Sequence, residues 1–148
     1  MIVKFHIEWN SNNNFEAAGD NPIVSVADIG GWLLLEFPRI VEKIKTTTII
    51  LDIASLINSL AGKFLGDGAG NVMPIHIDGS ALLFMRRTDR VVLYEFNPDL
   101  YDEKVNPVID EISLMEASAI SRVIFDEVMR EISKNAPEIK GKFMEMII

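Results

Sequence analysis

The stretch VMPIHIDGSALLFMRRTDRVVLYEF, residues 72–96, decides the fold class. It contains three apolar runs separated by two short polar breaks, Asp78-Gly79 and Thr88-Asp89. An Asp-Gly pair supplies the positive φ angles that a two-residue hairpin requires, and runs of this length and composition are typical of strands. We therefore predict a three-stranded antiparallel meander. The alternation leaves open which side chains of residues 82–85 face the core.

Three other segments have clear periodicity. Residues 2–9 alternate apolar and charged side chains, which predicts a strand with His6 on its solvent side. From Thr48 to Phe64 the apolar residues recur at intervals of three and four, which predicts an amphipathic helix. A capping box at residues 113–116 begins a second such helix, which we expect to end near Pro137, before one more short segment.

Residues 22–45 allow two interpretations. IVSVADIGGWLLLEF, residues 23–37, fits a hairpin that turns at its two glycines, but Asp28 also suits the cap of a short helix over 32–36. We favour the helix. Pro38 suits the first turn of a further helix over PRIVEKIK, residues 38–45, where the missing amide costs nothing.

Together these segments predict an α+β fold. An antiparallel sheet includes the meander, and amphipathic helices pack on one face of it. The length of 148 residues fits one domain over 1–148 that buries its own core. The order of the strands stays open.

Composition excludes several chemistries. The chain has no cysteine, which removes disulfides, thiolate zinc sites and thiol nucleophiles, and its two histidines are too few for a His-rich metal site. We expect no metal and no cofactor. The apolar runs fall short of the roughly 18 residues of a membrane span, and the N-terminus does not have the pattern of a secretory signal. A cytoplasmic protein is expected, with no membrane partner.

The loop GDGAG, residues 66–70, resembles a phosphate-binding loop only in its glycines. Such loops lead from a strand into a helix whose first amides face the anion. Here the order is reversed, since a predicted helix precedes the loop and a predicted strand follows it, and Asp67 brings a carboxylate to the place of the anion. We predict a connection between helix and strand.

One enzymatic alternative remains. It is a small hydrolase or transferase that uses His76 with Asp78 or Asp67. Asp78 is better explained as a turn former, because nucleophilic triads are normally assembled from distant parts of a chain. We therefore expect no catalytic residues.

Negative charge is the most informative feature for function. The net charge is −8, and residues 89–116 carry eight acidic and two basic residues, so six of the eight net negative charges lie in this segment. Carboxylates interleaved with aromatic residues suit contact with a basic protein surface, whereas nucleic acid requires lysine and arginine. The predicted partner contacts are Glu95, Asp99, Tyr101, Asp102 and Glu103, followed by Asp110 and Glu111.

The Asp78-Gly79-Ser80 hairpin and the acidic segment NPDLYDE, residues 97–103, in a small cysteine-free chain resemble the immunity proteins of bacterial toxin–immunity systems. The resemblance concerns the general character of the chain and implies nothing about its fold. It implies a non-enzymatic cytoplasmic inhibitor that binds the basic catalytic domain of a toxin, often a nuclease. A homodimer through the apolar face of the hairpin is a further possibility.

Overall fold

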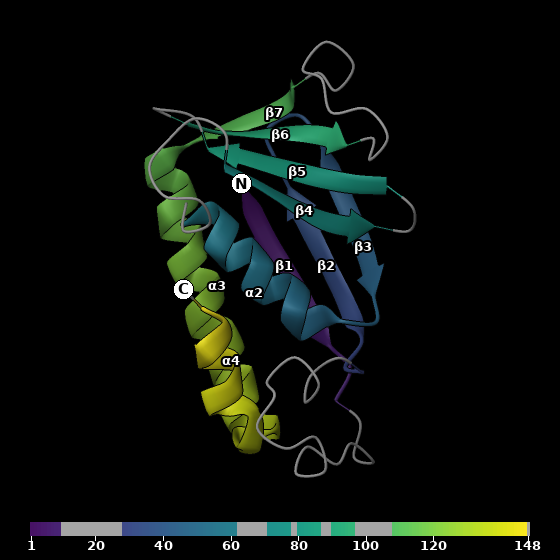
Figure 1. Ribbon diagram of the computed structural model, residues 1–148, viewed down its shortest axis with the longest axis vertical. Coiled ribbons are helices and arrows are strands. Elements are labelled where there is room, and N and C mark those ends of the chain that lie inside the picture. Colours follow the sequence, from purple (N-terminus) through teal and green to yellow (C-terminus); the bar gives the residue numbers. More distant parts are fainter. Residues whose placement is uncertain (10–27, 62–70, 78–79, 87–89, 97–107, 148) are drawn as a thin grey trace.

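The computed structural model describes residues 1–9, 28–61, 71–77, 80–86, 90–96 and 108–147. These residues form two antiparallel sheets and two main helices (Figure 1). Sheet A consists of β1 (Ile2–Ile7), β2 (Gly31–Glu36) and β3 (Val41–Thr46), in that order. Sheet B consists of β4 (Asn71–Ile77), β5 (Ser80–Arg86), β6 (Arg90–Phe96) and β7 (Val108–Ser113). The helices are α2 (Ile49–Leu60), α3 (Leu114–Asn135), the 3-10 turn η2 (Pro137–Ile139) and α4 (Lys140–Met146).

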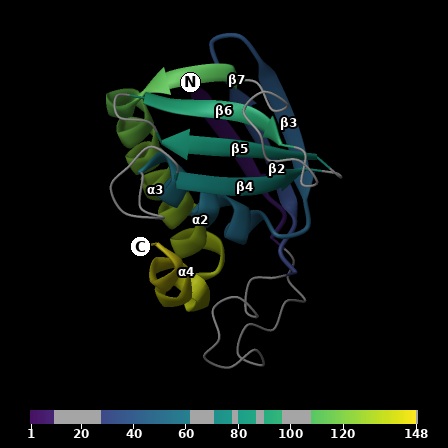
Figure 2. The ribbon, with the colours of Figure 1, turned by 45° about the horizontal axis from the view of Figure 1, so that its top comes forward.

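The predicted α+β class is confirmed, and so is the meander. It appears as β4, β5 and β6, with Ile77 paired to Ser80 and Arg86 to Val91. Figure 2 shows the four strands of sheet B side by side, where β7 extends the meander by one strand. The strand β7 was not predicted from the sequence.

The helices predicted over 32–36 and 38–45 are wrong, because these segments form the hairpin of β2 and β3. The turn lies at Pro38-Arg39, where the amide of Phe37 donates to the carbonyl of Ile40 over 2.8 Å. Along both strands the exposure alternates with period two, so that Leu33 and Ile44 are buried while Lys43 is exposed. The apolar stripe expected for a helix was therefore an accidental match to this alternation.

Gly31 begins β2 and is not the turn of a hairpin. A Cβ atom there would lie 2.0 Å from the carbonyl oxygen of His6 and 3.2 Å from Cγ1 of Ile49. Only glycine allows this close approach between β2, β1 and the start of α2.

The helix predicted between Thr48 and Phe64 is confirmed as α2, which is the central element of the core. Nine of its twelve residues are buried. Figure 1 shows why, since α2 crosses in front of sheet A, below the edge of sheet B and beside α3. The core joins apolar side chains from all of these elements, among them Leu33, Leu35, Ile44, Ile49, Ile53, Leu56, Val91, Leu93, Ile112, Ile124, Val128 and Ile132.

Helix α3 is fixed at its N-terminal end. The hydroxyl of Ser113 accepts a hydrogen bond of 3.1 Å from the amide of Glu116, which confirms half of the predicted capping box. The Glu116 carboxylate accepts from the terminal ammonium of Met1 instead of completing the box.

In the ranges described, none of the helices combines the length and the apolar character that a membrane span requires.

Candidate partner-binding site

Four of the seven predicted partner contacts belong to the connection between β6 and β7, residues 97–107, which we call the acidic connection. Tyr94 of β6 pairs with Val108 of β7, so the chain leaves one strand and enters the next at neighbouring positions. Asp99, Tyr101, Asp102 and Glu103 lie between them and outside the described residues. The backbone of Glu95 is described, within β6 opposite Leu82 of β5, but its side chain is not.

Asp110 is buried, with only 1% of its surface exposed. One carboxylate oxygen accepts hydrogen bonds from the backbone amides of Arg39 and Ile40, at 2.6 Å and 3.2 Å. The other oxygen accepts from the amide of Glu111 at 2.9 Å. Asp110 thus links β7 of sheet B to the turn between β2 and β3 of sheet A. Its predicted contact with a partner is corrected to a structural role, because a carboxylate held in this way is not presented at the surface.

Glu111 is exposed on the opposite side of β7. Its carboxylate lies 3.5 Å from Nε of Arg90, and both side chains are about half exposed, at 46% and 49%. An exposed pair of this kind adds roughly 0–1 kcal/mol to stability. Glu111 therefore offers a carboxylate at the base of the acidic connection, next to one neighbouring cation.

The residues of the enzymatic alternative are only partly described. The backbone of His76 lies in β4 opposite Ala81 of β5, while Asp67 and Asp78 fall outside the described residues. In the part of the chain that is described, no three acidic, histidine or cysteine side chains come together as a possible metal site.

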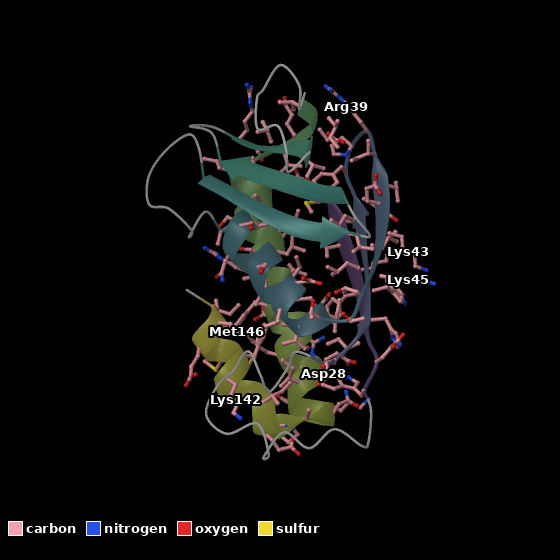
Figure 3. All side chains as sticks on the ribbon, turned by 45° about the vertical axis from the view of Figure 1, so that its right-hand side comes forward. Asp28, Arg39, Lys43, Lys45, Lys142 and Met146 are labelled. Carbon is pink, nitrogen blue, oxygen red and sulfur yellow. The ribbon has the colours of Figure 1, made fainter. Side chains whose placement is uncertain are left out.

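A surface that the sequence did not lead us to predict covers the side of sheet A that faces away from α2. We call it the open face, and it consists of Ile2, Lys4, His6, Trp32, Leu34, Glu36, Val41, Lys43 and Lys45. Lys43 and Lys45 project from β3 away from the helices (Figure 3). The Nζ atom of Lys43 lies 4.9 Å from the centre of the Trp32 ring, and the His6 ring lies 6.0 Å from it. In a chain of net charge −8, this face has three lysines and one carboxylate.

One sequence signal would have found the open face. Lys4 and His6 alternate with apolar residues in the predicted first strand, and Lys43 and Lys45 have the same spacing. Interpreted as strands, both segments put their cations on the side opposite the core. The helical interpretation of 38–45 concealed this arrangement.

The end of sheet A near the start of α2 has a second polar cluster. The Asp52 carboxylate accepts hydrogen bonds from the hydroxyls of Thr46 and Thr48, the latter at 3.3 Å. The amide of Thr48 donates to the Thr46 hydroxyl over 3.0 Å. A shallow cavity of about 510 Å³ next to this cluster is lined also by Glu8, Trp32 and Lys45. The cluster closes the junction between β3 and α2 through bonds among its own members.

No protein-family model matches the chain, and no match was found among curated proteins or solved structures.

Proposed function

We propose that this protein is a non-enzymatic binding protein of the immunity type, which inhibits a basic bacterial toxin domain through the acidic connection between β6 and β7. The observation that carries the proposal is the concentration of charge, since six of the eight net negative charges belong to residues 89–116. Local surpluses of this size guide oppositely charged proteins together and raise their rate of association.

The fold around the connection supports this role. The pairing of Tyr94 with Val108 brings the two ends of the connection together at one end of sheet B. Asp110 of β7 accepts hydrogen bonds from the backbone amides of Arg39 and Ile40, so the strand that follows the connection is bonded to both sheets. A rigid base lowers the entropy lost when a surface binds its partner.

The proposed contacts are Glu95, Asp99, Tyr101, Asp102 and Glu103, with Glu111 at the rim and Asp110 as their support. In the complex, the carboxylates would occupy positions where a nuclease toxin binds phosphate groups of its substrate. Tyr101 would supply the buried aromatic anchor, because tyrosine is enriched among the residues that dominate binding energy at interfaces.

The proposal predicts that the reading frame upstream of this chain encodes a large secreted protein with a basic C-terminal domain, and the test uses that domain. We expect the purified chain to bind that domain and to block its cleavage of nucleic acid. The triple variant Asp99→Lys, Asp102→Lys, Glu103→Lys should weaken binding at least about tenfold and flatten its dependence on salt, since carboxylate contacts with a basic groove are electrostatic. Calorimetric titration at two salt concentrations measures both effects.

A matched control separates local contacts from total charge. The triple variant Asp126→Lys, Glu127→Lys, Glu138→Lys changes the net charge equally, at exposed positions on α3 and η2. It should retain most of the affinity. If both triple variants lose the same amount of affinity, or if neither loses affinity, the acidic connection is not the binding surface.

A further inference from the structure

We propose that the free edge of β1 binds an acidic polypeptide segment in extended form, as a fourth strand of sheet A. This surface shares no residue with the acidic connection, so the inference does not rest on the proposed function. It follows from the hydrogen-bonding pattern of β1, from a trough beside it, and from the charges of the open face.

The first observation is an unpaired strand edge. Among the described strands, β1 pairs only with β2. In an antiparallel pair, alternate residues direct both backbone groups to the neighbouring strand. The amide of Glu8 donates to the carbonyl of Gly30 over 2.9 Å, which assigns the even-numbered residues to the β2 side. Val3 and Phe5 therefore direct their N–H and C=O groups to the other side, where the described residues provide no backbone partner.

The second observation is a trough of about 690 Å³ along this edge, between β1 and α3. Five consecutive residues from Ile2 to His6 line it, together with Trp32 and, on the helix, Glu127, Arg130 and Glu131. Consecutive residues of a strand point to opposite faces, so a cavity lined by all of them borders the edge of the strand. Five residues of extended chain, at about 3.3 Å each, span roughly 16 Å, so the lined stretch of β1 is long enough to pair with a short extended segment.

Contacts near both ends of β1 join this strand to α3. At one end the Met1 ammonium donates to the carboxylate of Glu116. At the other end, Nε1 of Trp9 donates to Oε1 of Glu131 over 3.4 Å. These contacts hold β1 and α3 alongside each other, which keeps the trough formed before any segment binds.

The third observation is charge, which selects an acidic occupant. A strand added beside β1 would place alternate side chains next to Lys4 and His6, on the open face that also has Lys43 and Lys45. The intervening side chains would lie next to Val3 and Phe5 and suit apolar residues. Opposite charges on neighbouring strands are stabilising, whereas like charges directly opposite each other are destabilising.

The same rule disfavours a second copy of this chain as the occupant. Antiparallel pairing of two β1 strands would place Lys4 and His6 of one copy against the same residues of the other. Lysine on an edge strand is a common defence against such pairing. The helix side of the trough has two carboxylates, Glu127 and Glu131, and one cation, Arg130, so it does not itself favour an acidic occupant. The preference comes from the open face, where Lys4 of β1 shares the sheet surface with Lys43 and Lys45.

The test compares two capped heptapeptides, one alternating glutamate with valine and one alternating lysine with valine. We expect the glutamate peptide to bind at least about tenfold more tightly in low salt, because its carboxylates lie next to Lys4 on the face that also has Lys43 and Lys45. Fluorescence anisotropy of labelled peptides measures this ratio. The charge reversal Lys4→Glu should reduce or invert the preference. Equal binding of both peptides, or stronger binding of the lysine peptide, would overturn the proposal.

Amide hydrogen exchange tests the strand pairing itself. In the free protein, the amides of Val3 and Phe5 should exchange quickly, while those of Lys4 and His6, which face β2, exchange slowly. Saturating glutamate peptide should slow the exchange at Val3 and Phe5. Unchanged exchange at these two amides would show that no strand is added, and protection without peptide, together with dimers in sedimentation, would show that a second copy occupies the edge.

Two proline variants, one on each edge of sheet A, test whether the edge of β1 is the binding site. Val3→Pro removes one edge N–H without removing a donor to β2, and proline is tolerated on edge strands. It should lower the affinity for the glutamate peptide at least about fivefold, a typical loss for one backbone hydrogen bond. Val41→Pro makes the same change on β3, at the opposite edge of sheet A, and should bind normally. An unaffected Val3→Pro variant that is folded by circular dichroism would contradict the proposal.

Discussion

The two faces of sheet A differ although the same three strands form them. On the inner face, Leu33 and Ile44 are fully buried against α2. On the open face, Ile2 and Val41 are 53% and 63% exposed, among lysines and next to Trp32. Since successive residues of a strand point to opposite sides, each strand contributes to both faces. The inner face therefore stabilises the fold, whereas substitutions on the open face should alter its charge and shape with little loss of stability.

The largest expected effect comes from two neighbouring leucines on the opposite faces of β2. Leu33→Ala removes a fully buried side chain and should lower the free energy of unfolding by about 3–4 kcal/mol. Leu34→Ala makes the same chemical change on the open face, where the side chain is partly exposed, and should cost about 1 kcal/mol or less. Urea denaturation of both variants measures the two values. Similar losses at both positions would mean that the faces do not differ in the way described.

The second prediction extends the comparison to β7, where Asp110 and Glu111 are adjacent carboxylates on opposite sides. Asp110→Ala leaves the amides of Arg39 and Ile40 without their acceptor and should cost about 3 kcal/mol. Glu111→Ala removes only an exposed pair with Arg90 and should cost about 0.5 kcal/mol. Thermal unfolding followed by circular dichroism compares them. Asp110→Asn, which retains one acceptor oxygen, should give an intermediate loss, and a loss for Glu111→Ala as large as that for Asp110→Ala would contradict this assignment.

The sequence predicted the parts of the fold that have a single strong periodicity. The Asp78-Gly79 break defined the meander, and the spacing of Ile49, Ile53 and Ile57 defined α2. Both signals are local, so they do not depend on which element packs against which. The α+β class followed from them directly.

The hairpin of β2 and β3 was missed because its two periodicities compete. Ile40, Val41 and Ile44 fit a helical stripe, while Leu33, Leu35 and Ile44 fit a strand. What decides between them is the buried contact of the inner face with α2, a tertiary effect that overrides local preference. Pro38 was consistent with both the helix and the hairpin, because proline is tolerated in the first turn of a helix and in a tight turn between strands.

Among the candidate site residues, the sequence identified carboxylates but not their individual roles. Asp110 and Ile112 alternate with exposed residues in β7, and this spacing is the signal that an acid lies on the buried side. The amides that it satisfies, at Arg39 and Ile40, are about 70 residues away in the chain. No local pattern contains that pairing, so only the arrangement of the two sheets reveals it.

The smallest expected change in stability concerns one contact on the open face. Lys43→Ala removes the cation over the ring of Trp32, a contact of 4.9 Å at an exposed site. Such contacts add about 0.5–1 kcal/mol at most, so the free energy of unfolding should change by about 0.5 kcal/mol. Urea denaturation measures the difference, with Lys45→Ala as the control, since among the described residues only Lys43 lies over the Trp32 ring. A loss as large as that of Leu33→Ala would mean that the open face, like the inner face, holds the sheet together, and that its lysines are not free to meet a partner.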